Sequence, residues 1–569
     1  MVSAFFRSLS VPSTTPSRRS FVAFSVLAGV GLPVLAGCDL PGASKAKDSA
    51  SANGSASAKG KAKAGSTDWQ KLDAHIMGHN VTVEVSPVIR KNDTTSIMAL
   101  ELTRAKDDAS IDRVKTDSSD TEDNKLNISS YLGTPSIYRP GTGASLVKLL
   151  DLGSGRVWSA TDGSGADDGF LEITPGEKTT SYLSFGKVDT DTVTVMVPMA
   201  GFTTVSVLEA DAAKKASIDL DAASSNLDQF PDAATELAKP ATIERYTRAL
   251  DDSTSTHTGD KDVTVTLASD VTFASDSADL TPAADTQLQT VADQLDQYPD
   301  GGTLTIVGHT DDVQDDAYNQ TLSEKRANAV KTKLQQLTKL DKWKTSVSGK
   351  GESQPKIKDT TDEARAANRR VEITLTPTGG TTPKDSNTSA TPSNGSDSGK
   401  LPAPQGPIAK GSKGVTLTSK DTNTSGEVTI TLDHLTRQDG YLLGTITCTV
   451  KDGSTGAPLH PLLEDPQTLL ANQRDEDGSA LPTFNASDGL TLIASGERIF
   501  PADYLDADAG QHLPLTELNI SDHLKTGTTT ICTIWPDPGG DTITLDHPEG
   551  KYSPKGTAYR LTDIPIKNS

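Results

Sequence analysis

Two stretches that cannot contribute to a core divide this 569-residue chain. Residues 39–66 are mainly Ala, Ser, Gly and Lys, and residues 377–414 are mainly Pro, Gly, Ser, Thr and Asn. Such segments bury too little apolar surface to offset the entropy of ordering, so both are predicted to be linkers. The chain is therefore expected to form separate folded segments at 67–250, 262–376 and 415–569.

The amino-acid composition argues against several classes of protein. Only 34% of the residues are hydrophobic, below the usual level of about 45–50%, which favours several modest cores over one large core. The net charge of −22 argues against a nucleic-acid partner, because binding a phosphate backbone needs a basic surface. Aromatic residues make up 4% of the chain, and a polytopic membrane protein is not expected.

The N-terminus has the pattern of an export signal. Residues 1–37 combine a basic start with an apolar run that ends in small residues, and Cys38 follows. Leu35-Ala36-Gly37-Cys38 resembles the lipobox of bacterial lipoproteins, which implies cleavage before Cys38, lipid on that residue and a membrane anchor outside the cytoplasm. The alternative is an ordinary secretory signal. Residues 17–22 also resemble a twin-arginine export motif.

The two outer segments show period-two hydrophobicity with Pro/Gly turns, which predicts antiparallel β-sandwiches. We interpret them as two immunoglobulin-like domains related by an internal repeat; two unrelated β domains are the alternative. The repeat is based on three matches: 81–85 with 428–432, 155–158 with 497–500, and 197–207 with 535–545.

Two of the three cysteines lie in the last segment, Cys448 in an early strand and Cys532 in the expected penultimate strand. An immunoglobulin-like sandwich bridges its two sheets at such positions, so a disulfide is predicted in an oxidising compartment. Two buried free thiols are the alternative.

The middle segment predicts alternating strands and helices. Pro282, preceded by the N-cap residue Thr281, should begin an amphipathic helix. The other predicted elements are strands at 263–267, 304–307, 343–347 and 368–373 and helices at 318–337 and 362–367. This pattern predicts a small α/β sandwich. The whole chain is then multidomain α+β, with a central α/β sandwich flanked by two β-sandwiches.

Six motifs of the middle segment are similar, in order and spacing, to those of the OmpA-like peptidoglycan-binding domain. They are Phe273…Ser277-Ala-Asp-Leu280, Gly308-His-Thr-Asp311, Tyr318-Asn319, Leu322-Ser323…Arg326-Ala327, Gly349-Lys-Gly351-Glu352 and Arg365-Ala-Ala-Asn368-Arg-Arg-Val-Glu372. The resemblance covers about 115 residues. It implies non-catalytic, non-covalent binding of cell-wall peptidoglycan through its stem peptide.

A diamino acid in the stem peptide offers a carboxylate and an ammonium to one pocket. An arginine can hold the carboxylate through two parallel hydrogen bonds, and an aspartate can accept from the ammonium. The resemblance implies these roles for Arg326 and Asp311, with Thr310, Asn319 and Leu322 near the pocket. The alternative for Arg326 is an ion pair with Asp311 that only holds the helix in place.

Arg369 and Arg370 also match the family, and we expect a structural role for them, closing the last strand on the helices. The loop after Asp311 is more acidic than in many members, with carboxylates at 312, 315 and 316. Its spacing does not match the twelve-residue calcium loop. Asp315 or Asp316 is expected to cap the following helix.

Other catalytic or metal-binding patterns are weak. His75 and His79 lack the intervening glutamate of a zinc protease. We therefore expect no catalytic residue, no metal and no cofactor. The favoured function is a lipoprotein that links the membrane to peptidoglycan, with a possible protein partner for the β domains. The alternatives are an adhesin or sensor whose β-sandwiches bind a protein, and a hydrolase directed to the wall.

Overall fold

The computed structural model describes most of the chain beyond its N-terminal region. The described residues are 64–109, 124–133, 143–160, 171–221, 237, 239–381, 401–420, 425–451, 456–465, 486–506, 510–520, 523–550 and 555–569. The predicted signal at 1–37, the predicted lipid site Cys38 and the linker up to residue 63 lie outside them, as does the 382–400 part of the second linker. None of the described helices is both long enough and apolar enough to cross a membrane.

The first β part contains eleven strands and two short helices among its described residues. They are β1 (Gln70–Ile76), β2 (His79–Val85), β3 (Val88–Arg90), β4 (Thr95–Arg104), β5 (Leu126–Asn127), α1 (Ser129–Leu132), β6 (Lys148–Asp151), β7 (Arg156–Ser159), β8 (Glu172–Ile173), β9 (Lys178–Gly186), β10 (Thr192–Val197), β11 (Gly201–Glu209) and η1 (Ala210–Ala212). The strands pair in the order β1-β2-β4-β3-β11-β10-β6-β7, and β9 pairs with β4. The β3–β11 pair is parallel.

The second β part follows the central domain. Its elements are β19 (Ile408–Lys410), β20 (Val415–Lys420), β21 (Ser425–Thr431), β22 (Leu435–Gln438), β23 (Tyr441–Val450), β24 (Ala457–Pro458), η2 (His460–Leu462), β25 (Thr491–Ala494), β26 (Glu497–Ile499), β27 (Asp503–Asp506), β28 (Gln511–Pro514), β29 (His523–Leu524), β30 (Gly527–Pro536), β31 (Thr542–His547) and β32 (Tyr559–Asn568). They pair in the order β26-β25-β31-β32-β22-β23-β21-β20, and β30 pairs with β23.

The two β parts share this pairing scheme strand for strand. β22 is parallel to β32, as β3 is to β11, and β23 pairs with β30, as β4 does with β9. This shared scheme supports the predicted repeat. The first two sequence matches fall on equivalent strands, β2 with β21 and β7 with β26.

The third sequence match is wrong by one strand. Residues 535–545 run from β30 into β31, whose equivalents are β9 and β10, so they correspond to 185–195 and not to 197–207. The strand sequences agree with this register: Asp-Thr-Val-Thr-Val at 191–195 matches Asp-Thr-Ile-Thr-Leu at 541–545. The Pro/Gly turns that suggested the earlier match lie at the ends of strands that are not equivalent.

Alternation within each strand sends one row of side chains into the core. In β4, Met98, Leu100 and Leu102 are fully buried, while Glu101 between them is partly exposed. Such rows from both β parts belong to one continuous hydrophobic cluster. Backbone contacts also join the two parts: the amide of Gly78 donates to the carbonyl of Thr528 at 2.9 Å.

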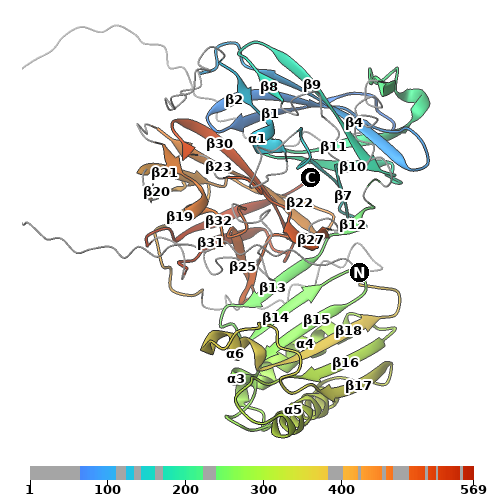
Figure 1. Ribbon diagram of the computed structural model, residues 1–569, viewed down its shortest axis with the longest axis vertical. Coiled ribbons are helices and arrows are strands. Elements are labelled where there is room, and N and C mark those ends of the chain that lie inside the picture. The colour runs from blue at the N-terminus through green and yellow to red at the C-terminus, as the bar shows by residue number, and fades with distance from the viewer. Residues whose placement is uncertain are drawn as a thin grey trace, which may run out of the picture. The chain divides into compact units, whose positions relative to one another are not determined.

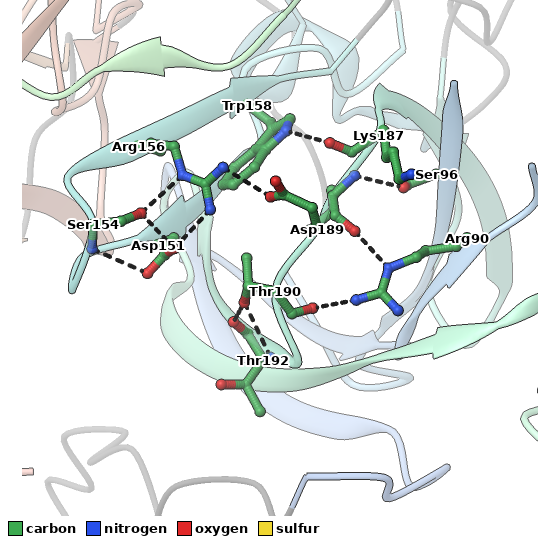
Figure 2. Close-up of polar contacts among 11 residues, drawn as sticks. Arg90, Ser96, Asp151, Ser154, Arg156, Trp158, Lys187, Asp189, Thr190 and Thr192 are labelled. Atoms are coloured by element: carbon green, nitrogen blue, oxygen red, sulfur yellow. Dashed lines mark hydrogen bonds and ion pairs between the residues drawn. The ribbon is translucent and has the colours of Figure 1, made fainter. Parts of the chain in front are cut away.

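An arginine at the end of an early strand holds a loop in each repeat. Arg90 donates through Nε to the carbonyl of Val188 at 2.6 Å and through Nη2 to that of Thr190 at 2.7 Å (Figure 2). In the second repeat Arg437 donates to the carbonyl of Gly540, which occupies the place of Thr190. Arg437 also pairs with the Asp537 carboxylate at 2.6 Å, so the guanidinium holds the loop through two carbonyls in the first repeat and through a carbonyl and a carboxylate in the second.

Figure 2 also shows how the β6–β7 hairpin is attached to the same loop. Arg156 forms ion pairs with Asp151 at 3.1 Å and Asp189 at 2.8 Å, and its guanidinium lies over the ring of Trp158. The indole of Trp158 donates to the carbonyl of Lys187 at 3.0 Å. The loop between β9 and β10 is therefore held from two sides.

Replacing Arg90 with methionine is expected to destabilise the protein by about 2 kcal/mol, because two loop carbonyls lose a charged donor. The measurement is the midpoint and slope of urea unfolding. The control is Lys410→Met, since Lys410 pairs with Asp563 on the surface, where both side chains are more than half exposed. The control should change stability by no more than about 0.5 kcal/mol. Equal effects of the two substitutions would contradict the role of Arg90.

The predicted disulfide is wrong: Cys448 and Cys532 are both buried free thiols. They lie on neighbouring strands of one sheet, where Cys448 pairs with Thr529 and Cys532 pairs with Thr445. Directly paired residues share a face, and residues three apart on a strand point to opposite faces. Thus Cys448 belongs to one hydrophobic cluster and Cys532 to another. Burial raises the pKa of the Cys448 thiol to about 12.

The central part forms a mixed sheet with helices. Its elements are β12 (Ala241–Thr242), β13 (Arg245–Ala249), β14 (Thr254–Thr258), β15 (Val263–Ala268), α3 (Ser269–Thr272), α4 (Pro282–Asp296), β16 (Gly302–Gly308), α5 (Asp316–Leu337), β17 (Trp343–Gly349), α6 (Asp362–Asn368) and β18 (Arg370–Pro377). The strands pair in the order β17-β16-β18-β15-β14-β13. Helices α4 and α5 pack side by side, and both contribute to the hydrophobic cluster of this sheet (Figure 1).

The helix starts agree with the sequence predictions. Thr281 caps α4 by accepting from the amide of Ala284, with Pro282 at the first helical position. Asp315 caps α5 by accepting from the amide of Tyr318 at 2.9 Å.

The fold class is more β than the predicted α+β. Strands dominate the described residues, and the long helices α4 and α5 are both in the central part. Both flanking parts are strand-rich, so the α/β character is local to the middle of the chain.

Candidate functional site

The loop after β16 and the first turns of α5 lie against the ends of two strands. Glycines permit this close approach: a Cβ on Gly308 would lie 2.2 Å from the carbonyl oxygen of Ser323, and one on Gly349 would lie 2.3 Å from its hydroxyl. The Ser323 hydroxyl in turn accepts from the amide of Gly351 at 3.0 Å. Small residues at both strand ends therefore position α5 beside the 309–315 loop.

Asp311 lies in this loop with its side chain 14% exposed. Its Oδ2 is 2.7 Å from Nη1 of Arg369. Arg369 also forms a two-point ion pair with Asp270, with distances of 2.7 and 2.6 Å. These carboxylates, that of Asp270 first, raise the pKa of the Arg369 guanidinium. Thus Arg369, and not Arg326, is the ion-pair partner of Asp311.

Arg326 is 5% exposed on the inner side of α5. Its Nε donates to the carbonyl of Ser277 at 2.9 Å, and its guanidinium carbon lies 5.2 Å from the centre of the Phe273 ring. Burial lowers the pKa of Arg326, and the nearby carboxylates of Asp270, Asp276 and Asp311 oppose that effect. Within the described part of the chain, no hydrogen bond engages its terminal nitrogens, which makes them available to a ligand anion.

The three further predicted residues lie around this loop. The Asn319 amide donates to the Asp311 carbonyl at 3.2 Å, to the Gln314 carbonyl at 3.0 Å and to the Glu352 carboxylate at 2.6 Å. Thr310 is 3% exposed, and its hydroxyl has no partner among the described residues. Leu322 is half-buried on α5. Asn319 therefore shapes the loop that carries Asp311.

Two neighbouring arginines, Arg365 and Arg370, also form ion pairs with carboxylates. Arg365 pairs with Asp312 at 2.8 Å, and Arg370 pairs with Glu372 at 2.7 Å. The pKa of Glu372 is lowered to about 2, first by His309 and then by Arg370, against the effect of burial. The interactions of Arg370 agree with the expected structural role. Arg369 joins α3 to the Asp311 loop through its ion pairs with Asp270 and Asp311.

The loop after β16 thus carries a largely buried carboxylate, Asp311, and α5 carries a buried arginine, Arg326, within electrostatic range of it. Among the described residues, no group of three or more His, Cys, Asp or Glu side chains could hold a metal ion. Asp311 and Arg326 carry opposite charges, and each side chain can pair with a group of the opposite charge. Sequence reasoning missed Asp270, which lies in a short helix where no motif marked it.

The fold and the site together define an OmpA-like domain. Residues 272–369 match the model of the OmpA family. This span contains five of the six motifs in full and all of the proposed ligand-binding residues.

Several known proteins are similar to a part of this chain of comparable length. Outer membrane porin F of Pseudomonas aeruginosa is 43% identical over 103 residues, which are 18% of this chain and 29% of that protein. The probable lipoprotein YiaD of Escherichia coli is 37% identical over 123 residues, 21% of this chain and 54% of that protein. A solved structure, the peptidoglycan-associated lipoprotein from Burkholderia pseudomallei, is 29% identical, with a TM-score of 0.17, over 18% of this chain and 86% of that one. The chain thus spans about a third to a half of the length of these curated relatives.

Proposed function

We propose that this protein is a non-catalytic cell-envelope lipoprotein that binds peptidoglycan through the diamino acid of the stem peptide. The observation that carries the proposal is Arg326, which is buried within electrostatic range of Asp311 while its terminal nitrogens keep their hydrogen-bonding capacity. A ligand carboxylate would accept two parallel hydrogen bonds from Arg326, and Asp311 would accept from the ligand ammonium.

Arg369 has a defined part in this proposal. In the free protein it neutralises Asp311 at 2.7 Å, so the carboxylate is not left without a counterion. A ligand ammonium would share Asp311 with Arg369, which stays attached to Asp270 through two other contacts. The aspartate therefore keeps its position on ligand binding.

The proposal also includes a lipid anchor at the N-terminus and a role for the two β parts. The sequence match at Cys38 supports a lipid anchor on the outer face of the cell membrane, and similarity to a probable lipoprotein agrees with it. The two β parts are proposed to be immunoglobulin-like spacers or protein-binding modules flanking the wall-binding domain, with domain limits at 67–250, 262–376 and 415–569. The β4–β9, β6–β10 and parallel β3–β11 pairs support that class of sandwich.

The test is sedimentation of the full chain with purified cell-wall sacculi. The wild-type protein is expected to enter the pellet, and the Asp311→Ala, Arg326→Ala double variant to stay in the supernatant. The control, Lys344→Ala, changes an exposed residue of β17 and should sediment like the wild type. Sedimentation of the double variant to the wild-type extent would overturn the proposed pocket.

A further inference from the structure

A second pocket lies outside the OmpA-like domain, on the first β repeat. Its volume is about 290 Å³, close to the lower limit for small-ligand pockets. The lining residues are Trp69, Glu84, Glu101, Thr180, Tyr182 and Ser217. The strand residues come from β2, β4 and β9 and lie on the face of the sheet opposite Leu100 and Leu102. On this face Trp69 and Tyr182 pack against a small separate cluster formed by Ile89, Ala213, Ala216 and Ile218.

Two carboxylates face each other in this pocket. Glu84 of β2 is the direct register partner of Glu101 of β4, and Glu101 is the register partner of Thr180 of β9. Like charges directly opposite each other on neighbouring strands are destabilising. The arrangement therefore has a cost that a bound cation would remove.

The second repeat shows that the fold does not require these carboxylates. The equivalent row across β21, β23 and β30 is Thr431, Thr447 and Thr530, paired in the same register. Threonines opposite each other are a favourable cross-strand combination. Only the first repeat carries the glutamates, although both repeats build the same sheet.

Aromatic rings form the walls beside the carboxylates. The indole of Trp69 donates to the carbonyl of Ala216 at 2.8 Å, which fixes its ring at the pocket. Tyr182 lies two residues after Thr180 on the same face of β9 and pairs with Ala99. Fixed aromatic faces next to carboxylates suit a cation on an apolar stem.

The two lysines nearest to the carboxylates do not prevent a second cation from binding there. Lys178 lies 2.9 Å from Glu101, but its side chain is 65% exposed. Lys71 is the register partner of Glu84, yet its ammonium lies 3.3 Å from Asp73. Within the described residues, no ion pair involves Glu84. A second cation can therefore approach Glu84 without displacing a buried contact.

We propose that this pocket binds a primary alkylammonium group, such as a lysine side chain of a peptide or a small free amine. The three ammonium hydrogens would reach the two carboxylates and the hydroxyl of Thr180. The alkyl stem would pack against Trp69 and Tyr182. This site is separate from the one proposed for peptidoglycan, and neither depends on the other.

The test is a ligand-observed NMR titration of the full chain with Nα-acetyl-lysine methylamide, which has an ammonium but no carboxylate. The Asp311→Ala, Arg326→Ala background removes the other candidate site from the experiment. We expect a Kd of about 1 mM, an affinity typical of one small group. The norleucine analogue, which has no ammonium, should bind at least about tenfold more weakly.

The matched variant is Glu84→Thr with Glu101→Thr, which copies the second repeat and should fold. Binding of the lysine probe should fall at least about tenfold, whereas Lys178→Met should leave it unchanged or strengthen it by removing a competing cation. If the double variant does not fold, Glu84→Gln gives the same test. Unchanged binding by the glutamate variant, or no binding to the parent protein at 20-fold the expected Kd, would overturn the site.

The source of the ammonium is decided by a second titration with pentane-1,5-diamine. Tighter binding of the lysine derivative would support a peptide lysine as the occupant. Tighter binding of the diamine would support a free amine, and in both cases the site itself is supported.

Discussion

Replacing Arg326 with methionine is expected to reduce affinity for a soluble stem peptide at least about 100-fold. The ligand carboxylate loses its charged donor and would be left unpaired beside the half-buried loop, a loss worth about 3 kcal/mol. Methionine fills a similar volume against the ring of Phe273, so the effect should be on binding and not on packing. Isothermal titration calorimetry of the full chain measures the affinity.

A different result is expected for stability, because the same substitution should leave the free energy of unfolding nearly unchanged. Burial lowers the pKa of Arg326, which means that the fold disfavours its charged form relative to the unfolded chain. The methionine variant loses the hydrogen bond to the Ser277 carbonyl but also the cost of burying the charge, so its stability should change by no more than about 1 kcal/mol, as measured by urea unfolding. Loss of binding together with loss of stability would indicate a residue that only supports the fold.

Two other variants sharpen the result. Arg326→Lys keeps the charge but cannot form two parallel hydrogen bonds, so an intermediate loss of about tenfold is expected. Lys333→Met changes the same helix two turns away, where Lys333 pairs with Asp285, and should leave the affinity unchanged. Wild-type affinity of Arg326→Met would contradict the proposed role.

Replacing Glu517 with glutamine is expected to stabilise the protein by about 3 kcal/mol at pH 8 and to have little effect at pH 4. Glu517 is 1% exposed and lies where the two repeats meet. Its Oε1 accepts from the amide of Met199 at 2.8 Å and from that of Cys532 at 3.0 Å. Burial raises the pKa of its carboxyl from 4.5 to about 7.

The direction in which stability changes with pH follows from the number of protons bound by the folded and the unfolded protein. Between pH 4.5 and about 7 the folded protein keeps a proton on Glu517 that the unfolded chain releases, so stability falls as pH rises through this window. A shift of two to three pH units corresponds to about 3 kcal/mol. Glutamine keeps the accepting Oε1 and does not ionise, so it removes this loss.

The measurement is urea unfolding of both proteins at pH 4 and pH 8. Glu427→Gln, at an exposed position of β21, is the control and should change stability by less than about 0.5 kcal/mol at either pH. A Glu517→Gln variant that is equally destabilised at both pH values would show that the carboxyl acts through its shape or contacts and not through its charge.

Much of the central domain could be predicted from local sequence. The start of α4 follows from Thr281 and Pro282, and the start of α5 from Asp315, because a helix cap acts within one turn of chain. The motif spacing likewise placed Asp311 after a strand and Arg326 on the following helix. Neither inference depends on contacts between distant segments.

The contacts within the candidate site could not be predicted in the same way. Sequence reasoning considered Arg326 as the ion-pair partner of Asp311, and the structure has Arg369 there instead. Arg369 follows α6, 58 residues after Asp311, and reaches it because β18 pairs with β16. Asp270 enters the site through the β15–β18 pair for the same reason. Which charges meet is decided by strand pairing.

Local sequence was sufficient to predict the strand periodicity, the helix caps and the motif that marks the OmpA-like domain, since each is encoded within a few neighbouring residues. The tertiary structure was needed to establish the register of β23 with β30, which points Cys448 and Cys532 to opposite faces. It also decided that Glu84 faces Glu101. A shift of one residue in strand pairing reverses every side chain, and that choice depends on the whole sheet and core.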